Sequence, residues 1–399
     1  MKVLVLCNKV PYPAQDGSSI AIKSLVEGLL HNGADVSMLS INTSKHYCPP
    51  EVTQAHLPKG LQYEALYHNN HITAGKVLAN LLSRQPFQVS RFYFGAFAER
   101  LSAILQDETY HWIQLEGLAM ATYLPLIRKR TRAKVALRAH NVEHEIWQRH
   151  LRHEKSIFNK LYLQLQNRRL RKMEWRTVAQ VDAVIAITER DSKSFAQWLP
   201  EKATITVPCG LNPAEYRVPA SKPRYDLGCL ASFDWLPNQQ GLLWFTEQVW
   251  PQLLLQRPGT TLAIAGRAMP AALRELAQKE GVHMLGEIDS LPEFLGQCRV
   301  MIIPLLAGGG MRIKILENMA YGQCMIATAV GAEGIALQAG RHIELADEPQ
   351  EFADKTVALL EDAPKQRAMG LAARQVLEEK YTHQKLGQKL LQFYENNAP

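Results

Sequence analysis

A glycine-rich loop carries the densest group of chemically useful residues in the chain. Gly308, Gly309 and Gly310 follow an apolar run that ends at Pro304 and precede a helical pattern. Glycines let a backbone approach a ligand closely, and the free N–H groups at the start of a helix attract an anion. The loop therefore predicts a site for a phosphate-bearing ligand.

Two cations and a carboxylate follow the glycines. Arg312 and Lys314 lie near the expected helix start at Met311, where the helix dipole by itself disfavours positive charge. A bound anion such as a diphosphate would account for them. Glu317 lies about one to two turns further along, where a carboxylate can accept hydrogen bonds from a ribose diol. The alternative is a flexible loop followed by a helix with surface charges.

Further polar residues follow predicted strands in the first half of the chain. His140 comes directly after the apolar run Lys134–Ala139, and Glu116 ends another such run. Asp16 and Gly17 lie between the first strand and the first helix. Ligands bind beyond the carboxyl ends of parallel strands, so these residues are candidates for substrate contact. Asp16 is equally suited to cap the helix that follows it, and a lone histidine is often structural.

The elements that must position these residues alternate along the chain. Short β-rich apolar runs alternate with longer amphipathic stretches, which is typical of parallel sheets covered by helices on both faces. The expected strands are Val3–Cys7, Asp35–Ile41, Trp112–Leu115, Lys134–Ala139, Ala183–Ile187, Asp226–Ala231, Thr261–Ala265, Val300–Pro304 and Met325–Thr328. The expected helices are Ser18–Leu30, Ile157–Arg176, Gly241–Gln256, Ala271–Glu280, Arg312–Tyr321, Gln350–Leu360 and His383–Glu395.

The length of 399 residues is enough for about two domains. The stretch 208–223 is rich in proline and is the best linker in the chain. We expect an N-terminal Rossmann-like domain over 1–210, a linker over 211–224 and a C-terminal Rossmann-like domain over 225–380. The last helix, within 381–399, is able to pack on either domain, including back on the N-terminal one. The expected fold class is α/β, with two doubly wound domains facing a cleft.

Composition excludes several classes of protein. The values of 47% hydrophobic and 21% charged residues are those of a globular protein, and they exclude disorder, collagen and coiled coil. No apolar stretch approaches the roughly 18 residues of a membrane span. The six cysteines contain no close pair, so neither a zinc knuckle nor a disulfide framework is indicated. A cytoplasmic protein fits best.

Positive charge is concentrated in one segment. The net charge is +7, but Arg128–Arg176 holds 15 Lys/Arg and 4 Asp/Glu, against 30 and 34 in the rest of the chain. Such a segment attracts polyanions such as nucleic acid, anionic lipid headgroups or phosphorylated substrates, and the alternative is a solvated helix face. Nucleic acid is disfavoured because no zinc finger, RNP-type or helix-turn-helix pattern accompanies the charge.

Three familiar phosphate-binding patterns are absent from the sequence. Gly-x4-Gly-Lys-Ser/Thr does not occur, and G-x-G-x-x-G does not follow the first strand, which disfavours a P-loop and a nicotinamide dinucleotide site. Asp-x-Asp, a pair that commonly holds Mg²⁺ or Mn²⁺ on a diphosphate, is also missing. We therefore expect no metal and no cofactor. Cationic side chains and a helix N-terminus would neutralise the diphosphate instead.

A set of motifs extends over nearly the whole chain. These are Pro11-Tyr12-Pro13 with Asp16-Gly17, Gln114–Gly117, Arg138–His144, Trp235–Asn238, Gly308–Gly322 and Gly331–Ile335. In this order they resemble the family 4 retaining glycosyltransferases of GT-B fold, above all bacterial members associated with surface polysaccharide assembly. The resemblance implies a UDP- or GDP-sugar donor held mainly by the C-terminal domain. It implies a saccharide or lipid-linked acceptor held mainly by the N-terminal one.

The resemblance also implies roles for the residues around the glycine loop. Glu317 matches the second glutamate of the family's E-x7-E motif, which holds the nucleotide ribose, whereas the first glutamate falls on Gly309. The family's usual Arg and Lys after the first strand of this domain have no counterpart within Ala231–Gln240, so other cations must replace them. The expected donor-binding residues are Arg267, Gly309, Gly310, Arg312, Lys314 and Glu317.

On the N-terminal side, His140 matches a histidine near the donor sugar. Because a front-face retaining mechanism needs no protein nucleophile, its expected role is to hydrogen-bond the sugar or orient the leaving group. Asp16 and Gly17 match a loop that faces the diphosphate and the acceptor, and Glu116 is expected to contact the acceptor. The basic segment Arg128–Arg176 would then contact the inner membrane face, where lipid-linked acceptors reside.

Two other functions remain open. One is a sugar-nucleotide epimerase or a phosphorylase on the same fold, and a phosphorylase would need a pyridoxal lysine that the sequence does not locate. The other is a non-enzymatic protein that binds nucleic acid or another polyanion through Arg128–Arg176. It predicts steeply salt-dependent binding and indifference to sugar nucleotides.

Overall fold

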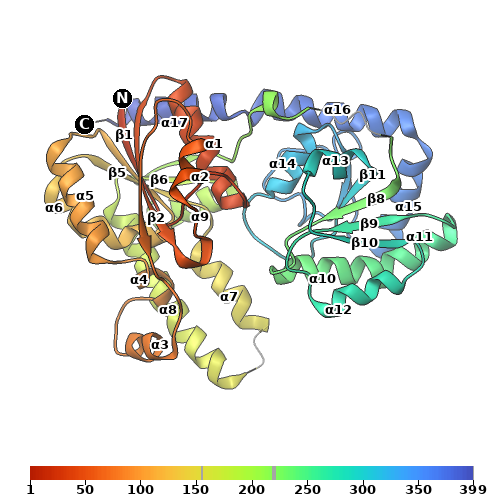
Figure 1. Cartoon of the computed structure of the whole chain (residues 1–399), viewed down its shortest axis with the longest axis horizontal. Helices are drawn as coiled ribbons and strands as arrows, with labels where there is room; N and C mark the ends of the chain where they lie inside the picture. Colours follow the sequence, from red (N-terminus) through yellow and green to blue (C-terminus); the bar gives the residue numbers. More distant parts are fainter. Residues whose placement is uncertain (154–155, 218–221, 399) are drawn as a thin grey trace. The chain divides into compact units, whose positions relative to one another are not determined.

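The chain folds into two compact units, each with its own parallel sheet (Figure 1). The computed structural model describes residues 1–153, 156–217 and 222–398. Unit 1 comprises Met1–Cys209 together with His383–Pro399, and unit 2 comprises Gly210–Thr382. Of the stretch 211–224, the structure describes 211–217 and 222–224, which belong to unit 2, and residues 218–221 lie outside the described residues. The expected α/β class with a pair of parallel sheets is confirmed.

Within the described part of unit 1, seven parallel strands form one sheet in the order β3-β2-β1-β4-β5-β6-β7. The strands are β1 (Lys2–Cys7), β2 (Asp35–Thr43), β3 (Gln62–His68), β4 (Trp112–Glu116), β5 (Lys134–Ala139), β6 (Ala183–Ala186) and β7 (Ala203–Thr206). In register, Leu4 of β1 lies beside Ser37 of β2 and Ile113 of β4. The central strands β1 and β4 are buried on both sides, as expected for a parallel sheet between helical layers.

Helices cover both faces of this sheet (Figure 1). They are α1 (Gly17–His31), α2 (Pro50–Ala55), α3 (Ala74–Leu81), α4 (Phe87–Ser90), α5 (Gly95–Asp107), α6 (Leu124–Arg130), α7 (Glu143–His153), α8 (Ile157–Gln180), α9 (Glu189–Trp198) and α17 (His383–Asn396), with 3-10 turns at Ser44–His46 and Leu118–Tyr123. Successive side chains of β1 point to opposite faces, so that Leu4 and Val5 belong to different core clusters. The sequence periodicity thus builds two cores around one sheet.

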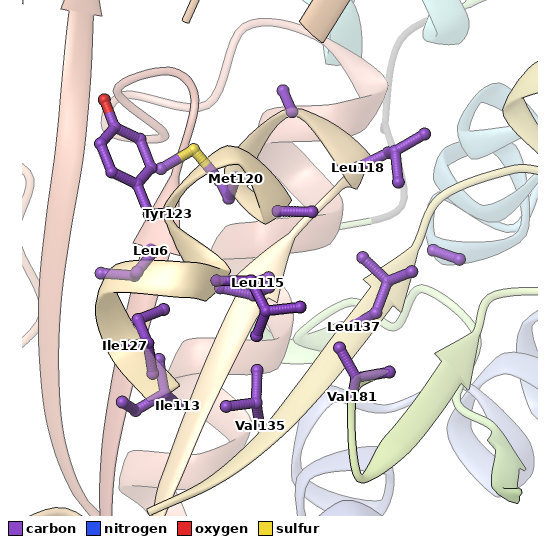
Figure 2. Packing of buried hydrophobic residues seen from close by; sticks show 14 of the residues in the cluster. Leu6, Ile113, Leu115, Leu118, Met120, Tyr123, Ile127, Val135, Leu137 and Val181 are labelled. Carbon is purple, nitrogen blue, oxygen red and sulfur yellow. The ribbon is translucent and has the colours of Figure 1, made fainter. Parts of the chain in front are cut away.

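Figure 2 shows the core on the face covered by α6 and the turn Leu118–Tyr123. Strand and covering side chains meet there: Leu6, Ile113, Leu115, Val135 and Leu137 from the strands, and Leu118, Met120, Tyr123 and Ile127 from the covering elements. Fully burying an aliphatic side chain contributes about 1.5–3 kcal/mol. This layer therefore holds β4 and β5 firmly, and their carboxyl ends carry Glu116 and His140.

The C-terminal helix α17 packs on the other face, against α1. A Cβ added to Gly28 of α1 would lie 2.2 Å from the carbonyl oxygen of His383, and one added to Gly387 would lie 2.2 Å from the carbonyl carbon of Gly28. Trp112 stacks on Tyr394 with ring centroids 4.5 Å apart, and its Nε1 donates to the Tyr394 carbonyl oxygen at 3.1 Å. The end of the chain is therefore an integral part of unit 1.

In unit 2, six parallel strands among the described residues form a sheet in the order β10-β9-β8-β11-β12-β13. They are β8 (Tyr225–Leu230), β9 (Leu262–Ala265), β10 (Val282–Gly286), β11 (Cys298–Ile303), β12 (Cys324–Ala327) and β13 (Glu344–Leu345). The helices are α10 (Leu236–Trp244), α11 (Trp250–Gln256), α12 (Ala271–Arg274), α13 (Leu291–Gly296), α14 (Ile313–Ala320), α15 (Pro349–Glu361) and α16 (Ala363–Lys380), with 3-10 turns at Pro213–Glu215 and Glu275–Gln278 and a π-helical turn at Phe245–Val249. Phe245, Trp250 and Phe352 are central to its core.

Two helix starts in unit 2 differ from those expected. The helix expected from Gly241 begins earlier, at Leu236, because Pro237 fits the first turn, where its missing N–H is not needed. The helix expected from Met311 begins at Ile313, with Arg312 at its N-cap position. The glycine loop is therefore longer than the sequence indicates, and Lys314 lies in the first turn of α14.

Candidate active site

Each sheet reverses its strand order next to the first strand of its unit. In unit 2, β9 and β10 lie to one side of β8, and β11, β12 and β13 lie to the other. In unit 1, the reversal lies between β1 and β4. Ligands of doubly wound sheets bind beyond the strand carboxyl ends at such a reversal. The residues singled out from the sequence lie at or beside these two places.

The loop after β11 is shaped around one arginine. Gly308 has a φ of 148°, and a Cβ there would lie 2.3 Å from Nη2 of Arg312 and 2.9 Å from the ring of Trp235. Gly310 has a φ of 72°, which also favours glycine. The buried Arg312 donates from Nη1 to the carbonyl oxygens of Gly309 and Gly310, and its guanidinium lies 5.5 Å from the Trp235 ring centre. Arg312 thus holds its own loop in shape.

The first turns of α14 bring a cation and a carboxylate together. Lys314 Nζ donates to Asn238 Oδ1 at 3.0 Å. Burial, reinforced by the charge of Arg312, lowers the pKa of Lys314 to about 8. Burial raises the pKa of Glu317 to about 7, against the opposing effect of Lys314. Both groups therefore change charge close to neutral pH, which is a property of binding and catalytic sites.

Arg267 lies just beyond β9, at the same carboxyl edge of the sheet. Its side chain is exposed, and its Nε donates to Ser232 Oγ at 2.8 Å. Ser232 in turn donates to Asp234 Oδ1 at 2.6 Å. These two residues belong to the loop after β8, so Arg267 ties the loops after β8 and β9 together. Its positive charge lies at the carboxyl edge of the sheet, from which the glycine loop also extends.

At the reversal in unit 1, Asp16 caps α1. Its carboxylate accepts from the Ser19 N–H at 2.8 Å, and Ser19 Oγ accepts from the Asp16 N–H at 3.0 Å. Although burial favours the neutral acid, the Lys9 ammonium 2.7 Å away and these hydrogen bonds lower the pKa of Asp16 to about 2. The capping alternative is what the structure shows for Asp16, and Gly17 is the first residue of α1.

Glu116 and His140 form a hydrogen-bonded pair at the ends of β4 and β5. His140 Nε2 lies 2.8 Å from Glu116 Oε2, and Arg138 Nη1 lies 3.4 Å from Glu116 Oε1. Burial alone would raise the pKa of Glu116, but Arg138 and His140 hold it below its usual value. Glu116 is fully buried, whereas 15% of the His140 side chain is exposed. His140 is therefore the member of the pair that a ligand can reach.

The pair continues into a buried polar network. Gln114 Nε2 donates to Glu116 Oε1 at 2.5 Å, and the Tyr394 hydroxyl donates to Gln114 Oε1 at 2.6 Å. Arg138 Nη1 also donates to a carbonyl oxygen of α1 at 3.0 Å. A network of this kind fixes both the place and the charge of its members. It runs from α17 through the ends of two strands to His140.

Among the residues that the structure describes, no group of three or more His, Cys, Asp and Glu side chains could hold a metal ion. Arg267 and Lys314 carry positive charge at the carboxyl edge of the sheet in unit 2, whereas the buried Arg312 is engaged with its own loop. The chemistry that this arrangement supports is the electrostatic binding of an anion beside a carboxylate.

Residues without an assigned role in the sequence also belong to these sites. Trp235 and Asn238 contact Arg312 and Lys314, and they lie within the motif Trp235–Asn238. Arg138 and Gln114 contact Glu116, and each lies in a motif. Tyr394 is 280 residues away from Gln114, in a helix that carries no motif.

The chain resembles known proteins over nearly its whole length. A protein described as an uncharacterized 44.6 kDa protein in cps region, from Klebsiella pneumoniae, is 24% identical over 401 residues, with 96% of this chain and 97% of the relative covered. The sucrose-phosphate synthase of Thermosynechococcus elongatus has a similar structure, with a TM-score of 0.69 and 17% identity over 99% of each chain. HepE of Anabaena, in complex with UDP, has a TM-score of 0.67 and 15% identity, covering 99% of this chain and 100% of HepE.

These likenesses agree with the strand orders described above. The solved structures share the two-sheet GT-B architecture of this chain. Residues 224–362, which include the glycine loop, Lys314 and Glu317, match the family described as Glycosyl transferases group 1.

Proposed function

We propose that this protein is a retaining glycosyltransferase that moves a sugar from a UDP- or GDP-sugar to a saccharide or lipid-linked acceptor. The observation that carries this proposal is the position of Lys314 and Glu317. They follow the glycine loop at the strand reversal of unit 2, inside the region that matches group 1 glycosyltransferases. The bound UDP of HepE supports a uridine nucleotide, and the relative in a cps region supports a role in cell-surface polysaccharide biosynthesis.

In the proposed donor complex, Glu317 accepts hydrogen bonds from the ribose diol. Lys314 and Arg267 neutralise the diphosphate, together with backbone N–H groups at the start of α14. Arg312 keeps the loop in the shape that exposes Gly309 and Gly310 to the ligand. The donor is therefore held by one helix start and its preceding loop.

In the proposed reaction, His140 hydrogen-bonds the donor sugar and so orients the leaving group. Glu116 accepts from Nε2 of His140, which leaves Nδ1 to accept a hydrogen bond from a hydroxyl group of the sugar. Stabilisation of the charge that develops on the diphosphate supplies much of the rate acceleration, and no protein nucleophile is required. Asp16 and Gly17 belong to the acceptor side, with Asp16 acting through the loop that it caps. Glu116 was expected to contact the acceptor, but its side chain is fully buried, so it acts through His140 instead.

Thermal unfolding with UDP, GDP, ADP and CDP tests the donor site. A nucleotide at about 100 times its dissociation constant stabilises by about 2.7 kcal/mol. We expect a shift with UDP or GDP that Lys314→Met reduces strongly. The control Arg341→Gln removes an exposed charge elsewhere in unit 2 and should leave the shift unchanged. If none of the four nucleotides shifts the transition, the donor site is wrong.

The proposed transfer is metal-independent, because cationic side chains take the place of a metal on the diphosphate. Sugar transfer from the donor selected by the unfolding assay should proceed at an undiminished rate in excess EDTA. Activity that EDTA abolishes and Mn²⁺ restores would contradict metal independence while leaving the donor site standing.

The proposed location is the cytoplasm, with peripheral contact to the inner membrane face through Arg128–Arg176. Residues 154–155 of this segment lie outside the described residues, and in the described ones α8 exposes Arg168, Arg171, Lys172 and Arg176. No described helix has the length and apolar character to cross a membrane. Each basic residue near an anionic surface contributes about 1 kcal/mol, so several must act together. Salt-sensitive co-sedimentation with anionic vesicles is the expected result.

A further inference from the structure

A second concave site lies in unit 1, between α7, α8 and the start of α9. The cavity has a volume of about 710 Å³. We call it the arginine cavity, and its lining residues are His144, Glu145, Gln148, Arg149, Leu151, Gln164, Asn167, Arg168, Arg171 and Arg190. None of them belongs to the candidate site at Glu116 and His140. Figure 1 shows α7 and α8 running side by side away from the sheet.

The charges of the lining do not balance. Two of the four lining arginines have carboxylate neighbours: Arg190 pairs with Glu145 and lies 3.8 Å from Asp191, and Arg149 lies 3.8 Å from Glu145. In the part of the chain that the structure describes, no carboxylate lies within ion-pair distance of Arg168 or Arg171. Guanidinium groups bind phosphate oxygens in a paired geometry, so an anion with several oxygens fits this excess.

The uncharged lining adds hydrogen-bonding capacity. Gln148 lies on α7, and Gln164 and Asn167 lie on α8. Oδ1 of Asn167 is buried without a hydrogen-bond partner among the described residues. A buried acceptor of this kind is satisfied by a donor on a ligand, such as a hydroxyl group. The lining therefore fits a ligand that carries both phosphate oxygens and hydroxyl groups, which is the chemistry of a glycosyl phosphate.

The cavity begins close to the candidate catalytic histidine along the chain. His140 directly follows β5, and α7 starts three residues later at Glu143, so His144 in the lining is four residues after His140 in the sequence. His144 itself is held by a 2.7 Å contact between its Nδ1 and Glu174 of α8. The arginine cavity and His140 are therefore held by consecutive elements of unit 1, β5 and α7.

The first turns of α8 add an apolar surface. Ile157, Phe158 and Leu161 are exposed by 72%, 85% and 61%. They precede Gln164 and Arg168 on the same helix, about one to two turns from the arginine cavity. An amphiphile with an anionic head could place the head among the arginines and its hydrocarbon chain along these side chains.

We propose that the arginine cavity binds the phosphate or diphosphate group of the glycosyl acceptor. The identity of this ligand as an acceptor rests on the proposed transferase function, but its binding does not. The same chemistry belongs to a lipid-linked glycosyl diphosphate and to a soluble sugar phosphate. The exposed apolar side chains in the first turns of α8 would contact the hydrocarbon chain of the lipid-linked ligand but not the soluble sugar phosphate.

The test compares two double variants that each remove two positive charges from α8. R168Q/R171Q changes the arginine cavity, and K172Q/R176Q changes exposed charges of the same helix outside it. Inorganic pyrophosphate binding to the full chain is measured by titration calorimetry in the Lys314→Met background, because the proposed donor site would itself bind a diphosphate. We expect saturable binding that R168Q/R171Q weakens by about tenfold or more, since two charge-assisted contacts are lost, while K172Q/R176Q changes it by less than about twofold. Absence of saturable binding to Lys314→Met, or equal losses in both double variants, overturns the proposal.

Two further measurements distinguish a lipid-linked ligand from a soluble one, and the anion site from the transferase function. Farnesyl diphosphate that binds more tightly than pyrophosphate, with the difference removed by Phe158→Ser, identifies a lipid-linked ligand, and equal affinities identify a soluble one. The UDP-induced shift in thermal unfolding should be the same in R168Q/R171Q and in the wild type. If UDP and the other nucleotides fail to shift the wild type while pyrophosphate binding passes its test, the anion site stands and the transferase function fails.

Discussion

The two charged residues of α14 illustrate how burial prepares a binding site. Removing Lys314 from water favours its neutral form, and removing Glu317 from water favours its protonated form. Each group therefore lies close to its own titration point in the absence of a counter-charge. A diphosphate beside Lys314 and ribose hydroxyls beside Glu317 would draw both into their ionised forms, so part of the binding energy comes from these two groups.

This pair predicts a bell-shaped pH dependence for UDP affinity. Lys314 is protonated below its pKa of about 8, so affinity falls as the pH rises past that value. Glu317 is ionised above its pKa of about 7, so affinity falls as the pH drops below it. Each limb should approach about a tenfold change per pH unit. Calorimetric titration with UDP between pH 6 and pH 9 measures both limbs.

Two variants show which residue causes each limb of the pH dependence. Glu317→Gln should flatten the acidic limb except for the titration of the terminal phosphate of UDP, whose pKa is about 6. Lys314→Met should flatten the alkaline limb at a lower overall affinity. An acidic limb that is unchanged in Glu317→Gln would show that another group controls it.

The buried Glu116–Arg138 pair predicts a large loss of stability when one partner is neutralised. Glu116→Gln leaves the Arg138 guanidinium buried without a counter-charge, and we expect the free energy of unfolding of unit 1 to fall by about 3 kcal/mol. Tyr394→Phe removes one neutral hydrogen bond to Gln114 and should cost about 1 kcal/mol. Urea unfolding, followed by hydrogen exchange of β4, measures both.

An exposed ion pair of the same unit provides the matched control. Glu64 lies 2.8 Å from Arg100, and both side chains are well exposed. Glu64→Gln should change the free energy of unfolding by less than about 1 kcal/mol. Equal effects of Glu64→Gln and Glu116→Gln would mean that the buried network adds nothing to the stability of unit 1.

Sequence patterns located the central elements better than the peripheral ones. Strands β1, β4 and β5 are mainly apolar because helices cover both of their faces, and they were predicted nearly to the residue. The edge strands β3 and β10 were not predicted, because their exposed positions carry polar residues that break the apolar run. Edge strands have one neighbour fewer and less cover, so their pattern is weaker.

The candidate site shows the same division. Local signals such as glycines before a helix pointed to Gly309, Lys314 and Glu317. The link from Tyr394 to His140 joins residues whose proximity depends on how α17 packs against unit 1, and no spacing along the chain contains that information. Contacts between distant segments depend on tertiary packing, which local patterns do not encode.

The crossing of α1 and α17 predicts that one methyl group is enough to disturb unit 1. Gly28→Ala would place a Cβ 2.2 Å from a carbonyl oxygen of α17, so the helices must separate. We expect a loss of about 3 kcal/mol in the free energy of unfolding and faster hydrogen exchange in α17. Gly95→Ala is the control, since a Cβ there meets nothing within 4 Å. A normal exchange rate in the α17 of Gly28→Ala would contradict the close crossing.

For the whole chain, the connectivity between the units has a consequence for stability. The chain leaves unit 1 after Cys209, forms unit 2 and returns at His383 to supply the last helix of unit 1. That helix covers Trp112 and completes the polar network through Tyr394. Unit 1 therefore depends on a segment that follows unit 2 in the sequence, whereas unit 2 is formed by one continuous segment.

A truncation after Thr382 tests whether unit 1, but not unit 2, depends on α17. Loss of α17 exposes Trp112 and removes the hydrogen-bond partner of Gln114. The midpoint of the thermal unfolding of unit 1 should therefore fall by several degrees or more. A loss of 1 kcal/mol lowers the midpoint by about 4–8 °C in a domain of up to 100 residues and by less in a larger one. The transition of unit 2, and its increase with UDP, should remain. Differential scanning calorimetry of the full chain and the truncated chain, each with and without UDP, measures both transitions. If the truncation removes the UDP-dependent increase, the nucleotide is not held by unit 2 alone, and the proposed donor site of Arg267, Lys314 and Glu317 is incomplete.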